Sequence, residues 1–259
     1  MIVDYHMHLR DPDERIDHTT SAIERFVETA AVRGVDEIGF SEHVYYFHQT
    51  RAIWAGPYES ERCVYDLDAY VGAVVEAKRQ GLPVKLGLEV DYVGDRQARL
   101  SELLEPYPWD YLLGSVHMID GLAVDQEPGI WAARSVDEVW RLYFDALAEL
   151  AGSGAVDVLA HPDLAKIFDR RPAEPAAFYP DLDGVALEIS TAGLHKFVGE
   201  LYPDPALLAG RPPVTLASDA HVPQNVGRDF DQALALAHRA GIETVTVFEG
   251  RRSRQEPLG

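Results

Sequence analysis

Histidines and carboxylates follow a series of short apolar stretches in this chain, and these residue types suit metal-ion binding. The first stretch ends in His6 and His8, two residues apart. Side chains at this spacing on a strand point to the same side, so the two imidazoles could bind one ion together. Other strand-like stretches end in the same residue types. These residues are His43, Glu89, His117, His161, Asp219 and His221.

Imidazole and carboxylate groups are ligands suited to Zn, Mn or Fe. Taken singly, each residue is ambiguous, because a lone histidine after an apolar stretch is more often a hydrogen-bonded core residue. The shared placement at strand ends favours a metal site instead. The candidates are too many for one tetrahedral ion, so we expect two or three divalent ions. Glu89 could bridge neighbouring ions at the ~3.5–4 Å spacing of multinuclear hydrolases.

The stretches that carry these residues alternate with helical patterns. Ser21 with Glu24, and Ser135 with Glu138, each form a pair typical of a helix N-terminus. Strand–helix alternation without a break in composition predicts a parallel sheet, and at 259 residues one closed barrel over residues 1–259. The candidate strands are 2–6, 37–41, 84–89, 111–119, 156–163, 185–191, 213–221 and 244–250, and the helical patterns lie at 21–34, 68–81, 135–152 and 231–241.

Two connections are longer than simple links require, and each follows the end of a candidate strand. They span 44–65 and 164–182. Long segments of this kind in a compact domain are usually functional, and barrel enzymes place their chemistry on the face where strands end. We therefore expect both segments to border the site.

The composition argues against a nucleic-acid-binding protein and against a membrane-spanning one. The formal net charge of −20 argues against general nucleic-acid binding, because the phosphates would be repelled. An anionic substrate would need bound cations that reverse the local field. We see no apolar run long enough for a membrane span and no secretory leader, and Cys63 is the single cysteine. A cytoplasmic location is the expectation.

With these residues in place, the sequence resembles the PHP (polymerase and histidinol phosphatase) family of metallophosphoesterases. The resemblance rests on seven short motifs that occur in the family's order: HMH, SEH, GLEVDY, GSVHMI, AHPD, EIST and SDAH. Within the family, GLEVDY, GSVH and SDAH are most similar to the histidinol-phosphatase branch.

The resemblance implies a distorted, TIM-like (β/α)7 barrel that holds up to three ions. It implies one ion at His6, His8, Glu89 and Asp219, a second at Glu89, His117 and His161, and a third at His43 and His221. The family's remaining ligand is a histidine six residues after the HxH pair, where this chain has Glu14. We assign that ligand to His18, with Asp13 and Glu14 as alternatives. The eight candidate strands also exceed the family's seven.

The implied activity is hydrolysis of a small phosphomonoester, most specifically L-histidinol phosphate, by a metal-bridging hydroxide. Glu89, Asp219 and His221 would be the catalytic residues, and the sequence leaves the proton donor open between Asp219 and a rim histidine. The candidate contacts to phosphate are Arg51, Ser115, Lys166, Lys196 and Arg228, with Arg228 preferred. Tyr45, Tyr46 and Trp54 could cover the imidazole of such a substrate or pack on one another.

Three alternatives remain open on the sequence alone. A PHP enzyme for another small phosphomonoester would carry the same ligands and differ only in its loops. An amidohydrolase-type enzyme also begins with HxH, but it typically uses a carboxylated lysine at the end of the fourth strand, where this chain has His117. A PHP module with a structural role, or a nuclease, fits less well with a near-complete ligand set and an acidic chain. The oligomeric state stays open.

Overall fold

A ring of parallel strands organises the structure, a computed structural model that describes residues 1–11, 13 and 15–259. Three strands pair in the order β1-β2-β3 and five in the order β10-β9-β8-β5-β4. All of these pairs are parallel. The strands are β1 (Val3–Asp4), β2 (Glu37–Phe40), β3 (Val84–Leu86), β4 (Glu89–Asp91), β5 (Leu113–Ser115), β8 (Val158–Leu159), β9 (Ala186–Ser190) and β10 (Val214–Ala217).

The two sheets join at both ends. β3 and β4 are consecutive halves of one extended stretch, the first paired with β2 and the second with β5. At the other side, the Tyr5 amide donates to the Leu216 carbonyl over 3.1 Å, and the Ala220 amide donates to the His6 carbonyl over 3.2 Å. The ring therefore has seven strand positions, as the resemblance implied.

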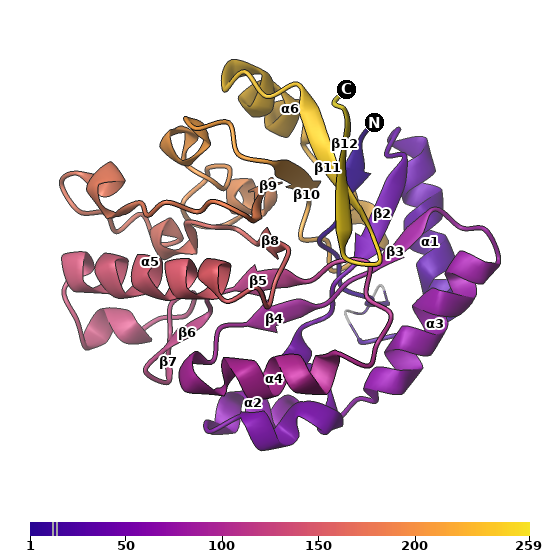
Figure 1. Ribbon diagram of the computed structural model, residues 1–259, viewed down its shortest axis with the longest axis horizontal. Helices are drawn as coiled ribbons and strands as arrows, with labels where there is room; N and C mark the ends of the chain where they lie inside the picture. The colour runs from indigo at the N-terminus through magenta and orange to yellow at the C-terminus, as the bar shows by residue number, and fades with distance from the viewer. Residues whose placement is uncertain (12, 14) are drawn as a thin grey trace.

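Helices surround this ring, as Figure 1 shows. Their apolar faces pack on the strands, and most connections carry short 3₁₀ turns. The α-helices are α1 (Thr20–Val32), α2 (Pro57–Arg62), α3 (Leu67–Arg79), α4 (Gln97–Leu104), α5 (Val136–Gly152) and α6 (Phe230–Arg239). The 3₁₀ turns are Val44–Tyr46, His48–Ile53, Gly94–Arg96, Ile130–Ala132, Leu164–Lys166, Pro175–Phe178, Ala192–His195, Pro205–Leu208 and Pro223–Asn225.

One of the two predicted helix starts is confirmed. Ser135 accepts a hydrogen bond from the Glu138 amide at the start of α5. The start predicted at Ser21 is wrong, because Thr19 is the N-cap of α1 and its hydroxyl accepts from the Ala22 amide. Thr19 and Ser21 are both good N-cap residues, so the sequence pattern could not separate them.

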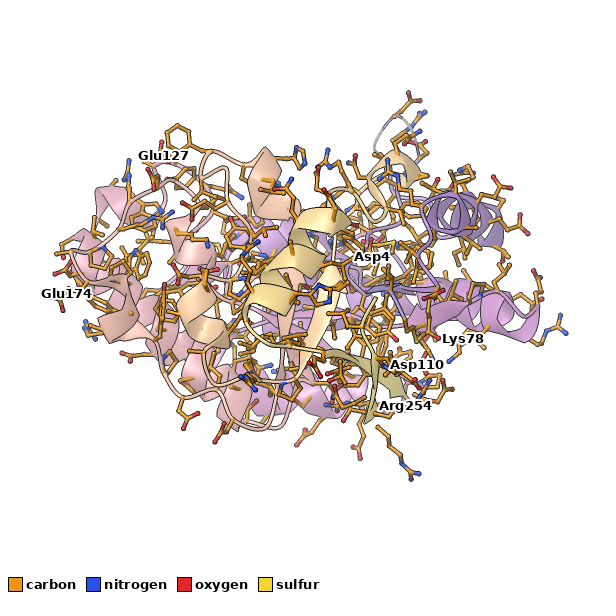
Figure 2. The ribbon with its side chains drawn as sticks, turned by 90° about the horizontal axis from the view of Figure 1, so that it is seen from above. Asp4, Lys78, Asp110, Glu127, Glu174 and Arg254 are labelled. Atoms are coloured by element: carbon orange, nitrogen blue, oxygen red, sulfur yellow. The ribbon has the colours of Figure 1, made fainter. Side chains whose placement is uncertain are left out.

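The eighth candidate strand lies outside the ring. β11 (Thr244–Glu249) pairs antiparallel with β12 (Arg252–Pro257), and a second small hairpin joins β6 (Met118–Ile119) to β7 (Leu122–Ala123). The apolar side of β11 is buried against Tyr5 and Tyr111. The chain ends meet here, since the Met1 amino group donates to the Pro257 carbonyl (Figure 1). The ion pair of Lys78 with Asp110 lies nearby, with Nζ 2.6 Å from Oδ2 (Figure 2).

Tyr111 fills the interior of the ring close to two glycines. An added Cβ at Gly39 would lie 2.3 Å from Tyr111 Oη, and one at Gly87 would lie 2.3 Å from Tyr111 Cζ. The Tyr111 hydroxyl donates to the Tyr5 carbonyl over 2.6 Å, which fixes the ring of Tyr111 in place. Glycine at these two positions is therefore required by space.

We expect Gly39→Ala to lower the free energy of unfolding by about 1–3 kcal/mol, the usual cost of overfilling a packed core. Gly72→Ala is the matched control, because Gly72 lies in α3 and a Cβ there meets nothing within 4 Å. That change should stabilise by about 0.5–1 kcal/mol, since glycine is a poor helix former. Urea unfolding of both variants measures the difference. Equal stability of the two would contradict the packing we describe.

No helix in the described part of the chain is both long enough and apolar enough to cross a lipid bilayer.

Candidate metal centre

Glu89 lies at the centre of the histidine cluster. Its side chain is fully buried at the start of β4, and the Ser115 hydroxyl donates to Oε1 over 2.5 Å. Five imidazoles surround it, each with a ring nitrogen within 3.8 Å of a carboxylate oxygen. They belong to His6 at 3.5 Å, His8 at 3.8 Å, His43 at 2.5 Å, His117 at 3.4 Å and His161 at 3.3 Å.

Asp219 supplies a second carboxylate, which approaches the same Nε2 atoms of His6 and His8 as Glu89 does. Its Oδ1 lies 3.8 Å from His6 Nε2, 3.4 Å from His8 Nε2 and 3.6 Å from His221 Nδ1. Asp219 has a φ of 52° and His161 a φ of 29°, in a region that non-glycine residues rarely occupy. Backbone strain of this kind concentrates at functional sites, where it aims a side chain.

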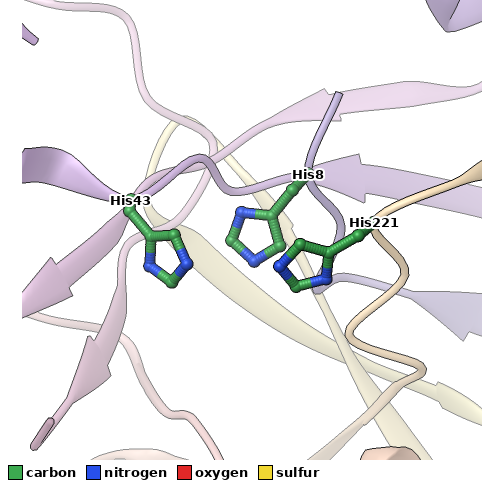
Figure 3. A group of neighbouring side chains, drawn as sticks. All are labelled: His8, His43 and His221. Carbon is green, nitrogen blue, oxygen red and sulfur yellow. The ribbon is translucent and has the colours of Figure 1, made fainter. Parts of the chain in front are cut away.

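The donor atoms lie close enough to one another for three of them to bind the same ion. Four groups of three residues have their donor atoms within 4.8 Å of one another. The rings of one group, His8, His43 and His221, extend from three separate segments toward each other (Figure 3). The other groups are His6 with His8 and Asp219, His6 with Glu89 and His161, and His43 with Glu89 and His117.

Several of these buried donor atoms have no hydrogen-bond partner among the described residues. They include His6 Nε2 and His8 Nε2. Buried polar atoms are normally satisfied, because leaving one unpaired costs about 1–3 kcal/mol. Bound divalent ions would satisfy all of them, so the residues present fit a multinuclear metal centre.

The charge balance of the cluster keeps its acids ionised. Burial alone would raise the pKa of Glu89, but the imidazoles of His43 and His6 hold that pKa well below its usual range. Burial lowers the pKa of His43, and a lower pKa favours the unprotonated ring that a metal requires. At His117 the carboxylates of Glu89 and Asp91 outweigh burial and raise the pKa to about 10. A metal ion would replace the proton on that ring.

Three further carboxylates, which the sequence analysis did not identify, orient the histidine rings. Glu188 in β9 is fully buried, with Oε2 2.8 Å from His6 Nδ1, and its Oε1 accepts from the His161 amide over 3.2 Å. Asp91 Oδ1 lies 2.7 Å from His117 Nδ1. Glu42 Oε2 lies 3.5 Å from His8 Nδ1. Such partners fix the ring orientation and raise ligand basicity.

A fourth acid holds the segment that carries Asp219. Asp4 at the end of β1 accepts hydrogen bonds from the amides of Ser218 and Gly227 and from the Ser218 hydroxyl (Figure 2). Burial raises the pKa of Asp4 to about 6, although these hydrogen bonds act in the opposite direction. Asp4 thus ties the first strand to the chain segment after β10.

We expect Glu188→Gln to weaken metal binding by about 10- to 100-fold, the usual effect of losing a carboxylate that orients a histidine ligand. Glutamine keeps the shape of the side chain but removes the charge that favours a proton on His6 Nδ1 and so leaves Nε2 free to bind a metal. Competition with a chromogenic chelator measures the affinity, and the exposed Glu174→Gln is the control. Unchanged affinity in Glu188→Gln would show that the His6 ring is held by other groups.

Among the described residues between His8 and α1, none belongs to any of the four groups. His18 Nε2 lies 3.3 Å from Glu42 Oε1, and its ring packs on Phe47 and Tyr70. Asp13 is exposed and pairs with Arg15. Glu14 lies outside the described residues. His18 therefore reaches the cluster through Glu42 in this structure, and its assignment as a ligand stays a prediction.

The candidate phosphate contacts lie in different surroundings. Lys196 lines a cavity of about 120 Å³ together with Glu89, His117, His161 and Asp219, and Ser115 touches Glu89 directly. The other three cations contact protein groups away from this cavity. Lys166 is buried and binds Asp163 and the Leu201 carbonyl, Arg51 donates to the Cys63 carbonyl, and Arg228 lies 3.9 Å from Asp229.

Two neighbouring charges also escaped the sequence analysis. Arg10 is buried with Nη1 3.5 Å from both oxygens of Glu42, which supplies a positive charge close to His8. Asp125 lines the 120 Å³ cavity and an adjoining one of about 220 Å³. No motif marks either residue, because the loops that carry them are positioned by the fold rather than by local sequence.

A ring of parallel strands with histidines and carboxylates gathered at its carboxyl end defines a metal-dependent enzyme of the barrel class. Residues 4–193 match the PHP domain family, and the chain belongs to that family. The family assignment from the sequence motifs is confirmed.

Similar proteins carry related names. A probable histidinol-phosphatase of Deinococcus radiodurans is 29% identical, over 93% of this chain and 94% of its own length. A second probable histidinol-phosphatase, from Thermotoga maritima, is 30% identical over 62% of this chain and 67% of its own.

A solved structure of histidinol phosphate phosphatase from Lactococcus lactis, in complex with zinc, L-histidinol and phosphate, has a TM-score of 0.67. It is 19% identical, over 98% of both chains. At this level of identity the similarity supports the fold alone.

Proposed function

We propose that this protein is a metal-dependent phosphomonoester hydrolase and that its substrate is L-histidinol phosphate. The observation that carries the proposal is the buried Glu89 carboxylate, surrounded by five imidazoles and bordered by Asp219, at the carboxyl end of a parallel barrel. Membership of the PHP domain family and the names of the relatives support the reaction and the substrate.

We assign the metal ligands to the residues that gather around these two carboxylates. Glu89 would bridge ions, with the remaining ligands His6, His8, His43, His117, His161, Asp219 and His221. Bound divalent ions supply an activated water at neutral pH and neutralise charge on the phosphoryl oxygens. The Lactococcus lactis structure of similar fold was solved with zinc, which is a divalent ion of this kind.

The protein's own groups would bind the ester and move its protons. Lys196 lies in the wall of the cavity that contains Glu89, and we assign it to a phosphoryl oxygen. Asp219 and His221 line the same cavity, so either could pass a proton to the leaving alcohol. The hydrogen bond from Ser115 holds the Glu89 carboxylate in one orientation while the ester binds.

We also propose that residues 1–259 form a single domain, since one ring of strands extends from Val3 to Ala217 and β11 packs against β10. Cytoplasmic location remains our expectation, which the single buried thiol of Cys63 supports.

Phosphate release from L-histidinol phosphate tests this function. Protein loaded with Zn²⁺ or Mn²⁺ should hydrolyse it with a kcat/KM of about 10⁴ M⁻¹s⁻¹ or more. Sugar, nucleotide and aryl phosphates form the comparison panel, and a His6→Ala/His8→Ala double variant is the blank. Metal-dependent activity that is no higher on histidinol phosphate than on the panel would contradict the substrate while leaving the phosphomonoesterase assignment in place.

A further inference from the structure

Two cavities open from the metal centre, and they share a wall. The smaller, of about 120 Å³, contains Glu89, Lys196 and Asp219, and the larger, of about 220 Å³, extends along the segment after β2. A substrate placed at the shared wall would have one part in each cavity. The shared residues are His43, His117, Asp125 and His221.

The two cavities differ in the charges of their walls. Lys196 gives the smaller one a cation that suits a phosphoryl group. None of the described residues that line the larger cavity is a lysine or an arginine. The acids in its wall are Glu59, Asp91 and Asp125. The larger cavity therefore suits a positively charged group and disfavours a second phosphate.

Glu59 is the most informative of these acids. Its side chain is nine-tenths buried, and its Oε2 has no hydrogen-bond partner among the described residues. Among the described residues, no ion pair involves Glu59, whereas Asp91 forms an ion pair with His117. A buried carboxylate without a cationic partner is costly, so such a group is expected to have a ligand as its partner.

Aromatic rings form the rest of this wall. Tyr45 packs against His43 with ring centroids 4.8 Å apart, and against Tyr46 and Tyr58 at 4.9 and 6.0 Å. All three tyrosines line the larger cavity. Rings of this kind stack on planar heterocycles and attract cations.

We propose that Glu59 binds the ammonium group of the substrate's alcohol moiety, while the three tyrosines enclose its imidazole ring. This assignment rests on the proposed function and adds a specificity-determining residue to it. Phosphate would lie in the cavity with Lys196, and the ester oxygen would lie at the wall that the two cavities share.

Glu59→Gln keeps the size of the side chain and removes its charge. We expect it to raise KM for L-histidinol phosphate by about 10- to 100-fold, the range for losing a hydrogen bond between charged groups. Two esters without an ammonium group should be unaffected: p-nitrophenyl phosphate and 3-(imidazol-4-yl)propyl phosphate. Calorimetry should show L-histidinol binding weakened by a similar factor. Glu61→Gln is the matched control, because Glu61 lies on the same helix and is exposed.

The outcomes separate the two proposals. A histidinol-phosphate preference that survives Glu59→Gln would overturn the role of Glu59 and leave the proposed function intact. An equal loss on all three esters would also overturn it, since that pattern indicates a structural role. A wild-type enzyme that hydrolyses p-nitrophenyl phosphate but does not prefer the ammonium-bearing ester would contradict the proposed substrate and the role of Glu59, and would leave the phosphomonoesterase assignment in place. The melting temperature of Glu59→Gln should match or exceed that of the wild type, because the variant removes an unpaired buried charge.

Discussion

Replacing Glu89 with glutamine should lower kcat/KM for phosphate release by about 150- to 5,000-fold and reduce the bound metal by at least one ion per chain. Five imidazoles face this carboxylate within 3.8 Å. Removing one partner of a buried charge pair costs about 3–5 kcal/mol, and each 1.36 kcal/mol corresponds to a factor of ten in rate. Glutamine preserves the shape, so packing is not the cause.

Steady-state assays and elemental analysis on the same preparations measure both effects. Glu24→Ala, an exposed position in α1, is the control and should match the wild type. A Glu89→Gln protein with full metal content and activity within tenfold of the wild type would show that Glu89 is not a ligand.

Removing the metal should produce the largest change in stability. A ligand that binds only the folded state at a hundredfold excess over its Kd adds about 2.7 kcal/mol. For a chain of this size each kcal/mol shifts Tm by about 2–4 °C. We therefore expect chelation to lower Tm by about 5–10 °C per ion lost, because the unpartnered nitrogens of His6 and His8 remain buried when the metal leaves.

Differential scanning calorimetry of the chelated and reloaded protein measures this shift. The His6→Ala/His8→Ala variant is the control, since it should show a smaller response to added Zn²⁺ or Mn²⁺. An identical Tm with and without metal in the wild type would mean that these side chains bind no ion at the concentrations tested.

Much of the site could be predicted from the sequence, because parallel strands end on the same face. More than a hundred residues separate His6 from His117, and His117 from Asp219. Each of the three nevertheless follows an apolar stretch that is expected to form a strand running in the same direction. The barrel brings such positions together irrespective of separation. The third-ion ligand in the loop after β1 could not be predicted this way, because a loop's path is set by contacts such as that of His18 with Glu42.

Two acids near the site, Glu188 and Glu59, were not predicted from the sequence. Glu188 lies within the buried stretch VALEIST, where an acid is unexpected, and this was an available signal that its charge has a buried partner. Glu59 lies in α2, a helix too short for its sequence pattern to show which side is buried. The extra strand at 244–250 was a correct strand prediction, but its antiparallel partner 252–257 is exposed and strongly charged, so nothing in its pattern indicated a hairpin.

The dependence of activity on metal is measured by phosphate release from L-histidinol phosphate while the metal-free protein is titrated with Zn²⁺ or Mn²⁺. We expect negligible activity before metal is added and a rise that saturates at two to three equivalents per chain. Full activity in protein shown by elemental analysis to hold less than a tenth of an equivalent of metal would contradict the claim that the Glu89 and Asp219 cluster acts through bound metal ions.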